Sequence, residues 1–180
     1  MDERLEHLIA HAERLLTRLE AVLPHAPKAP DWNASVAFRY RRRGASVVLE
    51  PVRHVATIRL DNLKEIDAQM ERLKRNTEQF VDGRPANNVL LTGARGTGKS
   101  SLIKACLNEF SERGLRLIEV DKTDLIELPD LVDLVASRPE RFIVFCDDLS
   151  FDEGEAGYKA LKSILDGSIS QASDLSLIHI

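Results

Sequence analysis

A short glycine-rich segment of the chain has the residue types and the spacing that bind phosphate. It runs from Gly93 to Ser100, reads GARGTGKS, and fits the pattern G-x-x-x-x-G-K-[ST] at every fixed position. Its glycines let backbone N–H groups close around an anion at the positive end of the following helix. Lys99 supplies a point charge for the β- and γ-phosphates, and Ser100 offers its hydroxyl to magnesium. The segment therefore predicts a site for ATP, or a closely related nucleoside triphosphate, with Mg2+.

The nucleotide contacts that we expect extend over the whole loop and into the first turn of the helix. The residues with this expected role are Gly93, Ala94, Arg95, Gly96, Thr97, Gly98, Lys99, Ser100 and Ser101. Arg95 lies inside the loop, where its side chain can lean over the nucleotide or point to solvent, and solvent is the ordinary expectation. A glycine-rich turn without any ligand is the alternative for the whole motif. The motif nevertheless follows an apolar strand and opens an amphipathic helix, which is the context that the pattern requires.

Two adjacent carboxylates follow an apolar run farther along the chain. Residues 142–146 read FIVFC, which is typical of a central parallel strand buried on both faces, and Asp147 and Asp148 come directly after it. The carboxyl end of such a strand faces the crevice where ligands bind in open α/β sheets. We expect Asp147 to hold magnesium together with Ser100. We expect Asp148 to act in catalysis with Lys99, by orienting or deprotonating the attacking water. A simple strand-end cap is the alternative for each acid.

A parallel sheet is needed to bring the loop and the acids together, and the chain alternates strands and helices as such a sheet requires. A helix carries Ile66, Met70, Leu73 and Phe80 and stops at residues 82–85. The pattern then predicts strand 89–92, helix 99–110, strand 115–120, helix 128–136, strand 142–146, helix 156–169 and strand 175–180. The fold class is therefore α/β, with a phosphate-loop core built on a parallel sheet.

The region before this core has a different character. Residues 2–23 carry an amphipathic pattern and predict a helix whose apolar stripe packs on its own domain, on a second copy or on another protein. Prolines at positions 24, 27 and 30 mark a linker. The chain then reads as extended, with the basic run of residues 39–43 interrupted only by Tyr40. A strand edge protected by charge is the ordinary explanation of that run, and contact with a nucleic-acid backbone is the sharper one.

Composition limits the class of protein. The chain has 180 residues, 43% of them hydrophobic, and a net charge of −4, which argues against broad nucleic-acid binding. No apolar run approaches the roughly 18–20 residues that span a bilayer, and the first residues are charged without a signal-like apolar segment. The two cysteines, Cys106 and Cys146, lack metal-ligand spacing, so we expect both to be buried thiols in a reducing compartment. These features predict a cytoplasmic protein without a membrane segment.

The motifs together resemble a bacterial family of AAA-plus-like ATPases that is catalogued only as a domain of unknown function. The resemblance rests on the phosphate loop and on the segments GLRLIEVDK at 114–122, FCDDLSF at 145–151 and YKALK at 158–162, and it runs from about residue 38 to residue 169. It implies a core of the additional-strand type, in which a later strand lies between the phosphate-loop strand and the strand before the acids. It also implies homo-oligomeric rings in which an arginine of a neighbour completes each site.

The chain departs from that family in three places. Asp148 stands where AAA-plus proteins generally carry glutamate, and its shorter side chain implies slow hydrolysis. Glu65 stands where relatives tend to have glycine, in a segment that usually lies near the adenine. The resemblance also implies a sensor residue, an arginine finger and a helical lid that the chain does not reach. Residues 174–180 look like translated sequencing-adapter DNA, so we expect a truncated chain with a foreign tail.

These observations divide the chain into an N-terminal helix, linker and extended region (1–56), an incomplete ATPase core (57–173) and a non-native tail (174–180). The favoured function is ATP hydrolysis by the complete protein, which acts on an unidentified partner that helix 2–23 could bind. One alternative is a nucleotide-dependent switch or loader that binds ATP but hardly cleaves it. The other is a small-molecule kinase, which needs a mobile basic lid that the sequence does not contain.

Overall fold

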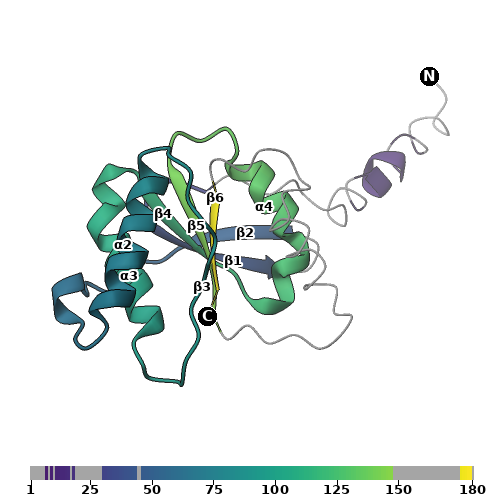
Figure 1. The fold of residues 1–180 in the computed structure, drawn as a ribbon. Coiled ribbons are helices and arrows are strands. Elements are labelled where there is room, and N and C mark those ends of the chain that lie inside the picture. The colour runs from purple at the N-terminus through teal and green to yellow at the C-terminus, as the bar shows by residue number, and fades with distance from the viewer. Residues whose placement is uncertain are drawn as a thin grey trace.

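A twisted sheet with helices on both faces forms the body of the molecule (Figure 1). The computed structural model describes residues 7, 9, 11–16, 18, 30–43, 46–147 and 175–179. Within them the sheet has six strands in the order β2-β1-β4-β5-β6-β3. The strands are β1 (Ala37–Arg43), β2 (Ser46–Pro51), β3 (Val89–Leu90), β4 (Leu115–Glu119), β5 (Arg141–Cys146) and β6 (Leu175–His179).

Strand β6 lies between the strand that leads into the phosphate loop and the strand that ends at the acids. It pairs in parallel with β5, where Cys146 is opposite His179, and in parallel with β3, where Leu90 is opposite His179. This order is the additional-strand arrangement, because a strand late in the sequence separates β3 from β5. Backbone pairing does not depend on where a segment's sequence comes from. The foreign origin of residues 174–180 therefore stays a prediction.

Strands β1 and β2 continue the same sheet beyond β4. β1 pairs in parallel with β4 and antiparallel with β2, so the extended region is joined to the core across the expected boundary at residues 56 and 57. The charge of the basic run suggested that β1 is a sheet edge, but this expectation is wrong, because β2 takes the edge position. Charge is compensated there by ion pairs of Arg39 with Glu119 at 3.1 Å and of Arg42 with Glu127 at 2.8 Å.

The helices cover the two faces of the sheet unequally. Helices α2 (Asp67–Val81) and α3 (Lys99–Phe110) pack on one face, while α4 (Leu128–Val135) and the 3-10 turn η3 (Lys122–Glu127) pack on the other (Figure 1). Two shorter 3-10 turns, η1 (Leu60–Asn62) and η2 (Ser111–Arg113), flank the first pair. Helix α2 ends because Gly83 adopts a left-handed φ of 70°, which lets the N–H groups of Gly83 and Arg84 reach the carbonyls of Phe80 and Gln79.

Strand β5 supplies side chains to the hydrophobic cores on both faces. Phe142, Val144 and Cys146 belong to the core under α4, whereas Ile143 and Phe145 belong to the core under α2 and α3. Trp32 belongs to the core on the α4 side. Its ring centroid lies 5.0 Å from those of Phe38 and Phe142, in edge-on contacts. A strand buried on both faces explains why the run 142–146 contains no polar residue.

Most elements lie where the residue pattern predicts them. The bounds of α3, α4, β4, β5 and β6 agree with the predicted ones to within one residue, and α2 begins one residue after Ile66. Strand β3 is shorter than the predicted strand 89–92, since regular pairing ends at Leu90. Those residues between 7 and 18 that are described are helical and exposed, and the rest of helix 2–23 lies outside the described residues, as does helix 156–169.

Candidate functional site

The candidate site begins with the loop that joins β3 to α3. Gly96 and Gly98 have φ values of 86° and 85°, which side chains with a Cβ atom adopt only with strain. A Cβ atom added at either position meets nothing within 4 Å, so backbone conformation rather than crowding requires glycine here. The first backbone hydrogen bond of the helix runs from Leu102 to the Gly98 carbonyl, at 2.8 Å. The N–H groups of the preceding residues are therefore available to an anion, as at any helix start.

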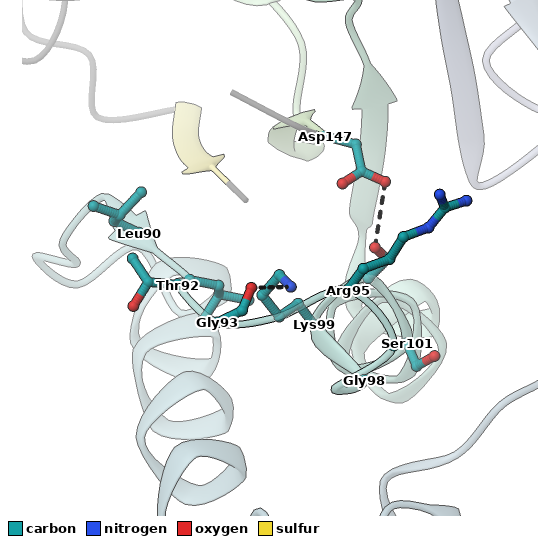
Figure 2. A pocket seen from close by; sticks show the side chains of 11 residues that line it. Leu90, Thr92, Gly93, Arg95, Gly98, Lys99, Ser101 and Asp147 are labelled. Atoms are coloured by element: carbon teal, nitrogen blue, oxygen red, sulfur yellow. Dashed lines mark hydrogen bonds between the residues drawn. The ribbon is translucent and has the colours of Figure 1, made fainter. Parts of the chain in front are cut away.

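Two side chains of the loop hold its backbone in place. Nζ of Lys99 donates to the carbonyl oxygens of Gly93 and Ala94, each at 2.8 Å. Oγ1 of Thr97 donates to the Ala94 carbonyl at 2.9 Å. Figure 2 shows Lys99 folded back along the loop toward Gly93. The ammonium group is thus held over the loop, where a phosphate group cradled by the backbone would meet it.

Asp147 meets the loop from the end of β5. Oγ of Ser100, in the first turn of α3, donates to Oδ2 of Asp147 at 3.3 Å (Figure 2). This contact joins residues 47 positions apart, and it exists because β5 and α3 both direct their loop-facing ends to the same edge of the sheet. A hydroxyl and a carboxylate at hydrogen-bonding distance are oxygen donors of the kind that magnesium binds.

Two groups near Asp147, the thiol of Cys146 and the carboxyl of Asp121, each stay in one protonation state near neutral pH. Burial, together with the nearby carboxylates of Asp121 and Asp147, raises the pKa of the Cys146 thiol to about 12. Cys106 is also buried, and burial raises its pKa to about 12. The expectation of two buried free thiols is confirmed. Asp121 is held as a carboxylate, because hydrogen bonds from the backbone and the hydroxyl of Thr123 lower its pKa.

A cavity of about 670 Å³ lies along the loop and opens toward Asp147. Its wall combines the end of β3, the loop backbone, the start of α3 and the end of β5. The residues that line it are Leu90, Leu91, Thr92, Gly93, Arg95, Gly96, Gly98, Lys99, Ser100, Ser101 and Asp147. A cavity of this size and polarity can hold a polyphosphate chain at the loop and a cation between Ser100 and Asp147.

A second cavity, of about 220 Å³, adjoins the first on the side of α2. The two cavities share the middle of the loop, including Gly98 and Lys99, but the second is bounded by Ile66, Gln69 and Leu102. Its wall is mainly apolar, in contrast to the wall around Asp147. Together the two cavities form a site with one polar and one apolar end.

Most of the residues expected from the sequence are brought together here. Seven of the nine expected loop contacts line the larger cavity, together with Asp147, and Thr97 lines the smaller one. Ala94 lines neither cavity and contributes its carbonyl to Lys99 and Thr97. Asp148, the second expected acid, lies outside the described residues.

The wall residues at the start of α2, Ile66 directly before the helix and Gln69 in its first turn, were not among those expected. Ile66 and Gln69 are separated from the loop by more than twenty positions, and their types carry no signal of a binding role. Glu65, directly before them, has a φ of 63° and is the non-glycine residue in the left-handed region among the described residues. Glycine adopts that conformation without strain, so Glu65 carries a backbone cost that a glycine would not.

The described residues contain no group of three or more histidine, cysteine or acidic side chains that could hold a metal by themselves. Magnesium does not require such a group, since it commonly binds through one or two protein oxygens and through the phosphates of its nucleotide. Ser100 and Asp147 fit that pattern.

Comparisons with known proteins agree with this architecture. The model of a family described as "Protein of unknown function (DUF815)" matches residues 33–180. Among solved structures, the chain is similar to the Orc1 protein of Aeropyrum pernix in complex with DNA, with a TM-score of 0.50 and 18% identity. The match covers 64% of this chain and 38% of the Orc1 chain. A search of curated proteins found no match.

The likeness to Orc1 concerns the fold, since so low an identity carries nothing further. The fold class is α/β with a mostly parallel sheet. Among the described residues, no helix is both long and apolar enough to cross a membrane.

Proposed function

Because the chain belongs to the family described as "Protein of unknown function (DUF815)", whose name assigns no activity, we propose its function from the site itself: it binds ATP with magnesium. The observation that carries the proposal is the convergence of the glycine-rich loop, Lys99, Ser100 and Asp147 on one cavity. No single one of these features is specific. Their combination at the carboxyl edge of a parallel sheet matches the chemical needs of a metal-bound triphosphate.

Each residue has a defined task in this proposal. The N–H groups from Gly96 to Ser101 cradle the phosphates, and Lys99 moves from the carbonyls that it now contacts to the β- and γ-oxygens. Ser100 and Asp147 hold magnesium, which when bound neutralises charge on the phosphate oxygens. Asp148 orients the water that attacks the γ-phosphate. The aspartate reaches less far than a glutamate would, so we expect slow turnover.

The complete protein is proposed to hydrolyse ATP as part of a homo-oligomeric ring. The basis is the resemblance to AAA-plus-like ATPases, in which a neighbour's arginine completes each site. Such an arginine contributes roughly 10³–10⁵ in rate in related phosphoryl-transfer enzymes. The chain alone is therefore expected to bind nucleotide better than it hydrolyses it.

Binding of nucleic acid is not part of the proposal, although Orc1 was solved in complex with DNA. The net charge of this chain is −4, which disfavours contact with a phosphate backbone. Two arginines of β1, Arg39 and Arg42, are engaged by the carboxylates of Glu119 and Glu127. Two of the four arginines of the basic run are thus paired within the protein itself.

Titration of a fluorescent ATP analogue into the purified chain, with magnesium, tests the proposal. We expect saturable binding by the parent chain and at least about a tenfold weaker affinity for Lys99→Ala, since a charge-assisted contact with phosphate is lost. Lys104→Ala is the matched control, because Lys104 is an exposed lysine of the same helix that lines neither cavity. Circular dichroism establishes that each variant is folded.

Absence of binding by a folded parent chain would refute the proposal for this chain. Equal loss in Lys99→Ala and Lys104→Ala would show a general charge effect instead of a phosphate site. Turnover is assayed separately as phosphate release without any added acceptor. Release under these conditions distinguishes hydrolysis from the kinase alternative, and binding with turnover at background in the full-length protein favours the switch.

A further inference from the structure

The two cavities along the loop differ in which charged groups they present. The larger one contains Arg95, Ser100 and Asp147, whereas the smaller one contains Ile66, Gln69 and Leu102 and no charged residue except the shared Lys99. If ATP binds as proposed above, its metal-bound terminal phosphates lie beside Ser100 and Asp147. The nucleoside then extends toward the apolar end. Arg95 therefore lies at the end of the site that holds the terminal phosphate.

Arg95 is the arginine that is placed to act there. It is exposed, and its side chain forms no hydrogen bond or ion pair with any described residue. Figure 2 shows it extending from the loop on the side where Asp147 lies, while Lys99 folds back toward Gly93. The guanidinium group can therefore turn to a phosphate without first leaving a described partner.

The other arginines near Asp147 are less well placed. Arg39 and Arg41 line a separate cavity of about 120 Å³ on the opposite side of Asp147. Arg39 is paired with Glu119, and the cavity of Arg41 also contains Asp121, so carboxylates already surround both. Neither arginine lines the cavity that contains Lys99 and the loop glycines.

From this arrangement we propose that Arg95 binds the terminal phosphate of the nucleotide and makes the site distinguish triphosphate from diphosphate. The inference rests on the proposed function, because it assigns a task within the same site. The planar guanidinium matches two phosphate oxygens at once, which a lysine cannot do. Lys99 reaches the β-phosphate, which ATP and ADP have in common, as well as the γ-phosphate, whereas Arg95 contacts only the group that ADP lacks. The loop then carries its own sensor of the γ-phosphate.

The test compares affinities for ATP and for ADP, each with magnesium, by isothermal titration calorimetry of the full chain. The variants are Arg95→Ala and Arg95→Lys, with Arg41→Ala as the matched control. Arg41→Ala removes the same charge on the other side of Asp147 but leaves the cavity wall intact. We expect Arg95→Ala to weaken ATP about tenfold and to change ADP by less than about twofold. Arg95→Lys recovers only part of the difference, and Arg41→Ala leaves the ratio unchanged.

The outcomes separate this inference from the function on which it rests. Parent binding of both nucleotides with an unchanged ATP-to-ADP ratio in Arg95→Ala would overturn the role of Arg95 and leave the nucleotide site intact. An equal change of the ATP-to-ADP affinity ratio in Arg41→Ala would also overturn it, because the loss of positive charge anywhere near Asp147 would then account for the effect. Equal weakening of ATP and ADP in Arg95→Ala is one form of that unchanged ratio, and it would overturn the proposal by assigning the residue to the shared phosphates. Absence of binding by the parent chain would reject both.

Discussion

Strands β5 and β3 both end at the candidate site, yet they are built differently. β5 has six residues, of which the last five are buried, and it is paired on both sides by β4 and β6. β3 has two residues, pairs with β6, and leaves Leu90 66% exposed. The strand that presents Asp147 is therefore fixed by packing on both faces, whereas the strand that presents the loop contacts the core only through partly buried residues such as Val89.

This difference shows that the two halves of the site are held in place by different interactions. Asp147 is positioned by the hydrophobic cores on both sheet faces before any ligand arrives. The loop is held instead by hydrogen bonds of Lys99 and Thr97 to its own carbonyls. A phosphate group competes for the ammonium of Lys99, so the loop can rearrange around it while Asp147 stays in place. Rigid support on one side and adaptable backbone on the other suits a site that binds and releases a nucleotide.

Thiol reactivity at the ends of the two strands should differ most. Cys146 has a pKa of about 12 because it is buried, so only about one thiol in ten thousand is ionised at pH 8. A cysteine placed by Leu90→Cys is exposed and has an ordinary pKa of about 8.5. We expect the introduced thiol to react with a maleimide at least about a thousandfold faster than Cys146, as followed by mass spectrometry of the digested chain.

The pH dependence checks the cause of this difference. The folded-state pKa of Cys146 is raised, so its reaction should accelerate about tenfold per pH unit until the pH approaches 12. Cys106, which is also buried with a pKa of about 12, serves as an internal control within each sample. Fast reaction of Cys146 beside a slow Cys106 would mean that β5 opens locally at its end, and the contrast between the strands would fail.

Stability should show the next largest effect. Phe142 is fully buried in β5 and contacts Trp32, so Phe142→Ala leaves a cavity and is expected to cost about 3–5 kcal/mol of unfolding free energy. Leu90→Ala in β3 should change it by less than about 0.5 kcal/mol, because that side chain is largely exposed. Urea unfolding followed by Trp32 fluorescence measures both. Equal losses would show that β3 contributes to the core as much as β5.

The residue pattern predicts the local structure of both strands better than it predicts their surroundings. The run 142–146 lacks polar residues, so its burial on both faces can be inferred. The exposure of Leu90 cannot, because an apolar residue before a glycine-rich loop looks the same whether or not a neighbour covers it. The extended pattern of the sequence identified β1 as a strand but did not predict its pairing with β4. The arginines of β1 suggested that it lies at the sheet edge, which β2 occupies instead. Pairing is decided by contacts between distant residues, which single-sequence periodicity does not contain.

The same limit applies within the site. The loop and Asp147 could be predicted because their chemistry requires particular residue types at fixed places. Ile66 and Gln69 could not, since a cavity wall near α2 accepts many side chains. Arg95 is intermediate: its position in the loop is evident from the sequence, but its place in the cavity with Asp147 is evident only from the structure.

The smallest expected effect concerns strain on the β3 side of the site. Glu65 holds a φ of 63° beside the smaller cavity, and a left-handed conformation costs a residue with a Cβ atom roughly 1–2 kcal/mol. Glu65→Gly removes this strain but adds freedom to the unfolded chain, so we expect a net stabilisation of about 0.5–1 kcal/mol in thermal unfolding. Glu65→Ala is the control, because it deletes the carboxylate and keeps the Cβ atom, and it should leave stability within about 0.5 kcal/mol of the parent. An equal gain in both variants would attribute the cost to the carboxylate. No gain in either would mean that the segment leading into α2 is relaxed, and that the two sides of the site differ in packing but not in strain.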